Sequence, residues 1–261
     1  MRDLAADLTL AHKLADFADA ISLNRYQSLD LVIETKPDLS PVTDADKAVE
    51  KKIRDILAIE RPDDLILGEE FGSPDLSSGN YYWVIDPIDG TKNFLRGIPT
   101  WATLIGLCNP EHDVVLGVVS SPSLYRRWFA TQGAGAFVSE NGGEPRQIKV
   151  SAVKELKNAS LSYSDLVGWG SRKDAMLSLQ ENIWRSRGLG DFWSHMLVAE
   201  GAADIAVEPV LAVWDMAALD IIVREAGGSF TNLDGKPGPH GGNGVSSNGI
   251  LHADFLKALN S

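Results

Sequence analysis

Two carboxylates three residues apart lie at the end of an apolar segment of the chain. In Trp83-Val84-Ile85-Asp86-Pro87-Ile88-Asp89, apolar residues lead directly into Asp86, and Pro87 restricts the backbone before Asp89. Two carboxylates that face one point repel each other unless a cation lies between them. With no His or Cys nearby, the pair suits Mg²⁺ or Mn²⁺ better than Zn²⁺. The segment therefore predicts a metal site at the tip of a strand.

The next two residues, Gly90 and Thr91, are typical of the start of a helix. Backbone N–H groups at a helix N-terminus bind anions such as phosphate well. The segment therefore predicts a site for an anion beside the site for divalent cations.

Three further groups of acids follow apolar segments or begin predicted helices: Asp44/Asp46, Glu69/Glu70 and Asp215. Each group has a simpler interpretation when it is taken alone. Asp46 lies three residues after Thr43, the spacing of a capping box, and Asp215 can cap a helix or face its dipole. Glu69 and Glu70 also fit a solvated turn. In combination with the pair at the strand tip, these acids indicate one shared metal site.

Hydrophobic periodicity predicts layers of helices and sheets. Apolar residues at three- and four-residue steps predict a first helix from Leu4 to about Tyr26, and Thr43 begins a second. Short β-branched segments separated by turn residues predict an antiparallel sheet between residues 102 and 150. Further helices are expected over residues 172–185, 191–201 and 214–226, with short strands at 64–67 and 205–207. This order of elements predicts sheets sandwiched between helices.

Composition narrows the class of protein. The chain has 261 residues, 44% of them hydrophobic and 23% charged, which fits one large domain or two fused halves. Its net charge of −12 and its lack of a basic segment argue against nucleic-acid binding. The single Cys108 cannot form an internal disulfide, and the N-terminus lacks the apolar core of a signal peptide. We therefore expect a cytoplasmic protein without a membrane span.

Four motifs resemble those of the inositol monophosphatase family of Mg²⁺-dependent, lithium-sensitive phosphatases. They are Gly68-Glu69-Glu70, residues 83–94 with their Asp-Pro-Ile-Asp-Gly-Thr core, Trp214-Asp215-Met216-Ala217-Ala218, and Glu225-Ala226-Gly227-Gly228. The resemblance covers nearly the whole chain and implies an α/β fold, the αβαβα layered sandwich of sugar phosphatases. It also implies two halves in one phosphatase unit. Residues 1–150 would carry most metal ligands, and residues 151–261 would carry Asp215 and the substrate selectivity.

The resemblance implies a role for each acid. The expected ligands of a first Mg²⁺ are Glu69, Asp86 and the backbone carbonyl of Ile88, and those of a second are Asp86, Asp89 and Asp215. Glu70 is expected to support this shell or a weaker third ion, so that two or three ions bind, with Mn²⁺ as an alternative.

The expected catalytic residues are Glu69, Thr91 and Asp46. The resemblance implies that Thr91 positions the attacking water and that Asp46 supports it through a hydrogen bond. Asp46 ends the motif Val42-Thr43-Asp44-Ala45-Asp46. Lys36 matches a lysine that the family has near the metals. The phosphate is expected to lie against Asp89, Gly90, Thr91 and Asp215.

The alcohol side of the site predicts the substrate. By resemblance, Glu208 contacts a substrate hydroxyl, and Gly190 and Asp191 lie beside it. The inositol enzymes have a small residue at the position of Asp191, so the added carboxylate favours a cationic alcohol over a neutral polyol. Residues 187–195 resemble those of the histidinol-phosphate phosphatases of this family in actinobacteria and plants. This resemblance implies hydrolysis of L-histidinol phosphate in histidine biosynthesis.

Several alternatives stay open at this point. Asp191 also fits a helix cap, Trp193 fits either core packing or ligand stacking, and His195 and Arg187 border the pocket or lie elsewhere. An inositol-1-monophosphatase or a broad sugar-phosphate phosphatase is the alternative of the same class. A more distant alternative is a non-catalytic partner of the transcription machinery. The family commonly forms homodimers, so a homodimer is expected.

Overall fold

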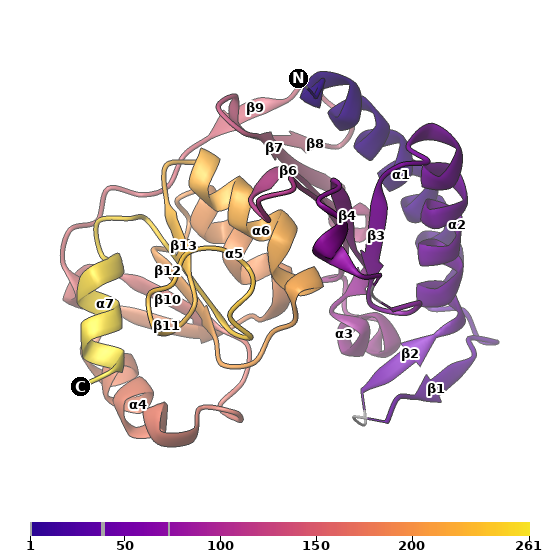
Figure 1. Ribbon diagram of the computed structural model, residues 1–261. Helices are drawn as coiled ribbons and strands as arrows, with labels where there is room; N and C mark the ends of the chain where they lie inside the picture. The colour runs from indigo at the N-terminus through magenta and orange to yellow at the C-terminus, as the bar shows by residue number, and fades with distance from the viewer. Residues whose placement is uncertain (1, 38–39, 73) are drawn as a thin grey trace.

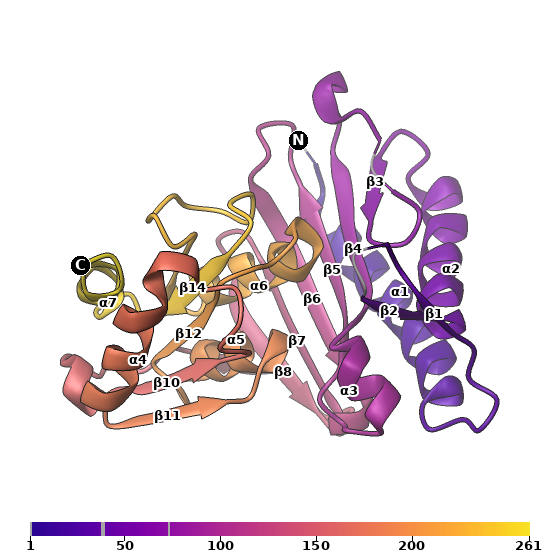
Figure 2. The ribbon, with the colours of Figure 1, turned by 90° about the horizontal axis from the view of Figure 1, so that it is seen from below.

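The computed structural model describes residues 2–37, 40–72 and 74–261, and five layers make up this part of the chain (Figures 1 and 2). The first layer is the pair of helices α1 (Leu4–Arg25) and α2 (Asp44–Glu60). Asp3 accepts hydrogen bonds from the backbone of Ala5 and Ala6 at the start of α1, and Thr43 and Asp46 form a capping box at the start of α2. Both predicted helices are therefore confirmed.

The second layer is a seven-stranded sheet, whose strands follow one another in chain order from β3 to β9. Strands β3 and β4 run parallel, and every later neighbour is antiparallel, as the sequence predicted for residues 102–150. The strands are β3 (Leu65–Gly68), β4 (Tyr82–Asp89), β5 (Ala102–Cys108), β6 (Val114–Ser121), β7 (Arg126–Thr131), β8 (Gly135–Glu140) and β9 (Arg146–Ile148).

Strand β4 positions the two carboxylates through an irregularity in its pairing. Asp86 lies opposite Leu104 and Asp89 opposite Ala102, so the register with β5 shifts between the two acids. In a regular strand, residues three apart point to opposite faces of the sheet. The shift lies between the two acids, in the segment that contains Pro87, which has no N–H to donate to the ladder, and it allows both carboxylates to face the same side.

The third layer consists of helices α5 (Asp191–Ala199) and α6 (Val213–Glu225), which lie between the two sheets (Figure 1). Helix α6 lies very close to the first sheet because β6 has a glycine beneath it. A Cβ atom at Gly117 would lie 2.7 Å from the backbone oxygen of Ala218. Any larger residue at this position would push α6, and Asp215 with it, away from the sheet.

The fourth layer is a five-stranded sheet in the order β11-β10-β12-β14-β13. Its strands are β10 (Ser160–Tyr163), β11 (Arg185–Gly188), β12 (Ile205–Glu208), β13 (Ser229–Thr231) and β14 (Gly244–Ser247). Helices α4 (Lys173–Asn182) and α7 (His252–Leu259) cover its outer face (Figure 2). This arrangement confirms the predicted αβαβα sandwich.

The prediction for this half was wrong at one helix end and omitted two elements. The helix predicted over residues 172–185 ends at Asn182, because Ile183 turns to an extended conformation and inserts its side chain into the core beneath the second sheet. Arg185 therefore begins the edge strand β11, which the sequence did not predict. Helix α7 was not predicted either.

The remaining elements are short. A two-stranded hairpin of β1 (Ile33–Thr35) and β2 (Pro41–Thr43) precedes α2, and helix α3 (Thr91–Arg96) follows β4. Single 3₁₀ turns are found at Leu76–Ser78, Pro122–Leu124, Leu156–Asn158 and Gly170–Arg172. None of the described helices combines the length and the apolar character that spanning a membrane requires.

Candidate active site

Asp86, Asp89 and Asp215 come together at one point, although they lie up to 129 positions apart in the chain. One carboxylate oxygen from each lies within 4.8 Å of the others. The first two extend from the end of β4, and Asp215 lies in the first turn of α6. They line a cleft of about 600 Å³ together with residues of α3, α5, β12 and the loop after β10. Three of the predicted metal ligands therefore share one site.

Each of the three carboxylates is held by one backbone N–H group. Asp86 accepts from Ile88 at 3.0 Å, Asp89 accepts from Phe192 at 2.8 Å, and Asp215 accepts from Ala212 at 2.7 Å. The bond to Phe192 also means that Asp89 satisfies an N–H at the start of α5. These contacts fix the direction of the carboxylates without supplying a positive charge.

Burial and mutual repulsion raise the pKa values of the three acids. Burial is the largest cause for Asp86, and the charges of Glu69, Asp89 and Asp215 raise its pKa further. Burial and the charges of Asp191 and Asp215 raise the pKa of Asp89. Burial also raises the pKa of Asp215 to about 7, although the N–H of Ala212 opposes the shift. The group is therefore a site of concentrated negative potential with oxygen donors only, which fits Mg²⁺ or Mn²⁺.

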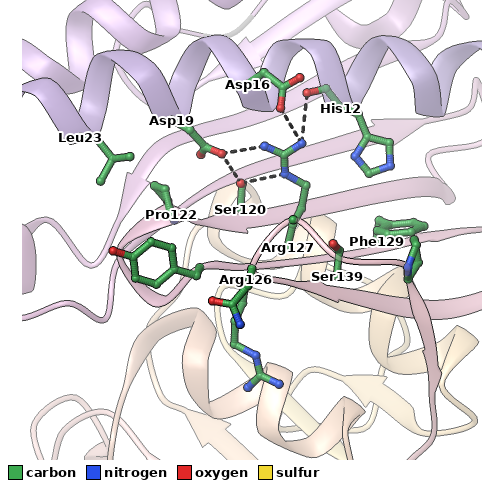
Figure 3. A pocket seen from close by; sticks show the side chains of 14 residues that line it. His12, Asp16, Asp19, Leu23, Ser120, Pro122, Arg126, Arg127, Phe129 and Ser139 are labelled. Carbon is green, nitrogen blue, oxygen red and sulfur yellow. Dashed lines mark hydrogen bonds and ion pairs between the residues drawn. The ribbon is translucent and has the colours of Figure 1, made fainter.

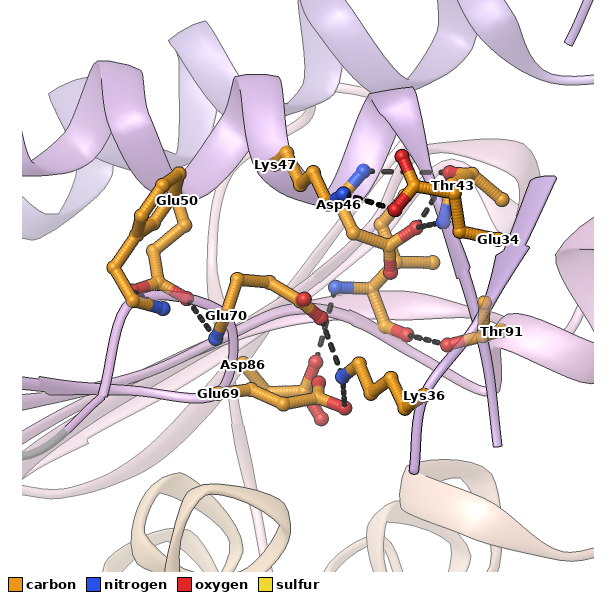
Figure 4. Close-up of polar contacts among 12 residues, drawn as sticks. Glu34, Lys36, Thr43, Asp46, Lys47, Glu50, Glu69, Glu70, Asp86 and Thr91 are labelled. Carbon is orange, nitrogen blue, oxygen red and sulfur yellow. Dashed lines mark hydrogen bonds and ion pairs between the residues drawn. The ribbon is translucent and has the colours of Figure 1, made fainter. Parts of the chain in front are cut away.

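Lys36 and two glutamates border this group on the side of β3 (Figure 4). The ammonium of Lys36 lies 2.6 Å from Glu69 Oε1 and 2.7 Å from Glu70 Oε1. Burial lowers the pKa of Lys36, but its hydrogen bonds to the two glutamates outweigh that effect, so its pKa is raised. Glu50, which is fully buried in α2, accepts the backbone N–H of Glu70 at 2.7 Å and so fixes this turn. Lys36 thus lies near the acids, as predicted, and is paired with two of them.

The alcohol side of the cleft carries a second pair of acids, Asp191 and Glu208. Both line the cleft, and Glu208 is only 4% exposed. Burial raises the pKa of Asp191 to about 7, the charge of Glu208 raises it further, and the nearby Lys92 lowers it. Asp191 has a φ of +44°, and Gly190 before it has a φ of +74°. The backbone is therefore turned into the left-handed region where the carboxylate enters the cleft, and Gly190 is suited to that conformation.

A family comparison agrees with this geometry. The sequence pattern of the inositol monophosphatase family matches residues 3–261. This chain belongs to the inositol monophosphatase family. It is similar to the histidinol-phosphatase of Mycobacterium tuberculosis, at 54% identity over 98% of each chain. It is also 51% identical to that of Streptomyces coelicolor, over 100% of this chain and 99% of the relative. An inositol monophosphatase structure from Zymomonas mobilis has a TM-score of 0.84 at 31% identity and covers 100% of both chains.

One contact expected of an inositol monophosphatase is absent. The Thr91 hydroxyl donates to the carbonyl oxygen of Ile88 at 3.0 Å, and Asp46 Oδ2 accepts from the backbone and hydroxyl of Thr43. Asp46 Oδ1 is buried and has no hydrogen-bond partner. The predicted hydrogen bond between Thr91 and Asp46 was therefore wrong for this structure, because the Thr91 hydroxyl donates to the carbonyl of Ile88 instead. Burial raises the pKa of Asp46 to about 7.

Gly90 forms the turn between β4 and α3. It has a φ of +79°, and a Cβ atom there would lie 3.0 Å from the carbonyl oxygen of Thr100 and 3.1 Å from Asp191 Oδ2. Only glycine fits both the conformation and the space. The prediction that helix α3 begins directly after Gly90 is confirmed.

Three candidate residues of the predicted substrate side do not line the cleft. Arg187 is exposed on β11 and donates to the carbonyl of Ser186. Trp193 packs edge-on against Trp128 in the core between the sheets, so ligand stacking was the wrong alternative. His195 is fully buried behind Glu208. Gly190 occupies the N-cap position of α5 and Asp191 is the first residue of the helix, so Asp191 is not the N-cap residue.

Among the cleft residues that the sequence analysis did not predict, two lie directly after Thr91. The amide of Asn93 donates to Asp191 Oδ2 at 3.1 Å and to the carbonyl of Thr100 at 2.9 Å, so it holds the Asp191 carboxylate. Lys92 lines the cleft beside it. Both follow Thr91 directly in the segment 83–94, so their position next to the acids was the available signal.

A second cavity, of about 470 Å³, lies between α1 and strands β6 to β8 (Figure 3). Its acids are paired. Arg127 contacts Asp16 at 2.8 Å and Asp19 at 2.6 Å, and it donates to Ser120 at 3.0 Å. Burial raises the pKa of Asp19, and Arg127 opposes the shift. The charges of this cavity are therefore neutralised from within.

Proposed function

We propose that this chain is a Mg²⁺-dependent phosphomonoesterase that hydrolyses L-histidinol phosphate to L-histidinol and phosphate, as in histidine biosynthesis. The observation that carries the proposal is the pair Asp191 and Glu208, which brings a partly buried and a buried carboxylate to the proposed alcohol side of the cleft. L-Histidinol has an ammonium group and an imidazole, and charge-assisted hydrogen bonds to carboxylates are the strong way to recognise them. The two relatives named histidinol-phosphatase support the same substrate.

We propose the cation ligands from the same geometry. Glu69, Asp86, Asp89, Asp215 and the carbonyl of Ile88 would hold two or three Mg²⁺ ions, with Mn²⁺ as a substitute. Bound divalent cations supply an activated water and neutralise charge on the attacking and leaving oxygens. The support lies in the donor set, since two buried carboxylates and the partly buried Asp215 converge with no cationic side chain bonded to them in the described part of the chain.

The chain's own residues would position the phosphate. The backbone at Gly90 and Thr91 turns into the cleft beside the acids, so its N–H groups suit the phosphate oxygens. The Thr91 hydroxyl lies on the cleft wall, and we propose that it orients the attacking water. Catalysis then depends mainly on position and electrostatics, as is general for phosphoryl transfer.

The alcohol would lie towards α5 and β12. Asp191 is held by Asn93 and faces the cleft at the start of α5, and Glu208 ends β12 at the same wall. We propose that these two carboxylates receive the ammonium and the imidazole of histidinol. A neutral polyol would leave the pair without a counter-charge, which disfavours an inositol phosphate.

A direct comparison of substrates tests the proposal. Phosphate release is measured with Mg²⁺ from L-histidinol phosphate and from myo-inositol 1-phosphate under the same conditions. We expect a clear preference in kcat/KM for histidinol phosphate. A preference for inositol phosphate would support the phosphatase activity but contradict the proposed substrate. Release of phosphate from neither ester would contradict the proposed activity.

We further propose that the protein acts as a cytoplasmic homodimer. The single cysteine, Cys108, is buried and unpaired, which fits a reducing compartment. The family commonly forms homodimers. Light scattering during size-exclusion chromatography tests this assembly, and a mass of 28.2 kDa would show a monomer.

A further inference from the structure

His195 is a buried histidine with one unused ring nitrogen. It lies in the second turn of α5 and is 0% exposed. It packs against the second sheet, where the ring centroid of Phe230 on β13 lies 5.7 Å from that of His195. Its Nε2 atom is buried and makes no hydrogen bond. Burying a polar nitrogen without a partner is costly, so such a group in a native core needs a reason.

The unused nitrogen faces the substrate side of the cleft. His195 Nε2 lies 3.5 Å from Glu208 Oε1, slightly beyond hydrogen-bonding distance. Glu208 ends β12, lines the cleft and is itself 4% exposed. The ring thus lies behind the carboxylate that the proposed function assigns to the substrate.

Ser246 sets the orientation of the ring from the other side. Its Oγ atom, fully buried on β14, lies 2.8 Å from His195 Nδ1. If the neutral ring accepts the serine hydroxyl at Nδ1, its proton lies on Nε2 and points to Glu208. The opposite tautomer would direct a lone pair at the carboxylate, which is repulsive. The contacts therefore favour a ring that offers Nε2–H to Glu208.

We propose that His195 is a positioning residue, which donates Nε2–H to Glu208 and fixes this carboxylate for the cationic end of the substrate. Hydrogen bonds of this kind are often long in a free enzyme and shorten in the substrate complex. A neutral imidazole orients a carboxylate without cancelling its charge, whereas a guanidinium would cancel it. This arrangement keeps Glu208 attractive to a cation. The inference rests on the proposed function, since it deepens the role of Glu208 in substrate choice.

His252 provides a matched control in the same half of the chain. It is 9% exposed, and both of its ring nitrogens have partners, Ser247 Oγ at 2.8 Å and Thr231 Oγ1 at 2.9 Å. Neither partner lines the cleft. A substitution there tests the loss of a buried histidine as such, without any effect on Glu208.

The decisive experiment compares His195→Gln, His195→Leu and His252→Gln with the wild type. The side-chain amide nitrogen of glutamine reaches about as far as Nε2, so it can donate to Glu208, whereas leucine fills space without donating. The readout is the ratio of kcat/KM for L-histidinol phosphate to that for the neutral ester β-glycerophosphate. We expect His195→Leu to lower this ratio about tenfold, mainly through KM for histidinol phosphate. His195→Gln is expected to recover most of it, and His252→Gln to leave the ratio as in the wild type.

The result separates the inference from the proposed function. A wild type without preference for histidinol phosphate would reject the proposed function. A preference that survives in His195→Leu, or that is lost equally in the Gln and Leu variants, would overturn the positioning role alone. The tautomer is measured independently by ¹⁵N NMR of histidine-labelled protein, assigned with Ser246→Ala. A neutral ring protonated at Nδ1 would overturn the inference whatever the substrate and however well the variants fold.

Discussion

The active-site cleft and the cavity beside α1 both hold acids, but they differ in where the counter-charge comes from. In the cavity, the guanidinium of Arg127 contacts Asp16 and Asp19 directly. In the cleft, Asp86, Asp89 and Asp215 each accept a backbone N–H group, and within the described residues no lysine or arginine forms an ion pair with them. The charges of neighbouring acids act on Asp86 instead. Burial raises carboxylate pKa values in both places. For Asp19 in the cavity, Arg127 opposes the shift more strongly than Asp16 adds to it, whereas for Asp89 in the cleft the charges of Asp191 and Asp215 add to it.

The difference shows how to tell a structural group of acids from one that receives a cation. A buried acid that is paired with an arginine has its counter-charge as soon as the chain folds. Asp220, which lies 2.7 Å from Arg224, is another example. Three converging carboxylates without such a partner are costly unless a cation binds. The same reasoning extends to Asp191 and Glu208, where the missing counter-charge would be supplied by the substrate itself.

The largest effect is expected from Asp89→Asn. The amide oxygen can still accept the N–H of Phe192, so α5 stays in place, but the site loses one negative charge. We expect kcat/KM for L-histidinol phosphate to fall at least about a hundredfold at saturating Mg²⁺. The matched control is Asp19→Asn in the cavity, which removes a charge of the same kind and is expected to keep activity within about threefold. Wild-type turnover by Asp89→Asn would contradict the assignment of the cleft.

The next effect concerns the second pair of acids. Asp191→Asn removes the charge while keeping an oxygen for Asn93, and asparagine tolerates the positive φ at this position better than alanine does. We expect kcat/KM for L-histidinol phosphate to fall about tenfold more than that for β-glycerophosphate. Equal losses on both substrates would mean that Asp191 shapes the site but does not recognise the cationic group of the substrate.

A third prediction concerns the pH dependence of stability without metal. The folded-state pKa of Asp215 is about 7 and its usual value is 3.8, so the folded state binds more protons between these two pH values. The free energy of unfolding of the metal-free protein should therefore fall as pH rises from about 4 to about 7. Mg²⁺ should reverse this loss at neutral pH.

Thermal melting of the chelated protein at pH 5 and pH 8, with and without Mg²⁺, measures this effect. Asp215→Asn isolates the contribution of the cleft, because other titrating groups are the same in both proteins. The variant should melt higher than the wild type at pH 8 without metal and should gain less from Mg²⁺. A wild type that melts equally with and without Mg²⁺ at pH 8 would contradict the prediction.

The sequence predicted those parts of the fold and site that depend on local pattern. Helix α2 and its cap, the strand leading into Asp86 and the turn at Gly90 each follow from a few adjacent residues. The assembly of Asp215 with the β4 acids followed only from the resemblance to a family. Nothing in the residues between them fixes how α6 approaches the sheet, which depends on contacts such as Gly117 beneath Ala218.

The predictions that failed concern contacts that depend on which face of a helix or strand packs against which neighbour. Helix α5 lies between two sheets, so Phe192, His195 and Met196 are all buried and its periodicity does not say which side faces the cleft. The roles of Trp193 and His195 were therefore not predictable from spacing. The predicted hydrogen bond between Thr91 and Asp46 also failed, because the Thr91 hydroxyl donates to the nearby carbonyl of Ile88 instead.

Arg127→Met is expected to have the smallest effect on activity. It tests most directly whether the counter-charge distinguishes the cavity from the cleft. This change leaves Asp19 half-buried without its cation, as the acids of the cleft are, and should lower the free energy of unfolding by about 2 kcal/mol at neutral pH. Removing Arg127 removes the interaction that lowers the pKa of Asp19, so this pKa rises further above its usual value. The destabilisation should therefore be small near pH 4 and grow as pH rises.

Urea unfolding at pH 4.5 and 7.5 measures the difference, and adding Asp19→Asn should remove the pH dependence. If the double variant stays as pH-sensitive as Arg127→Met, the counter-charge on Asp19 is not what distinguishes the cavity from the cleft.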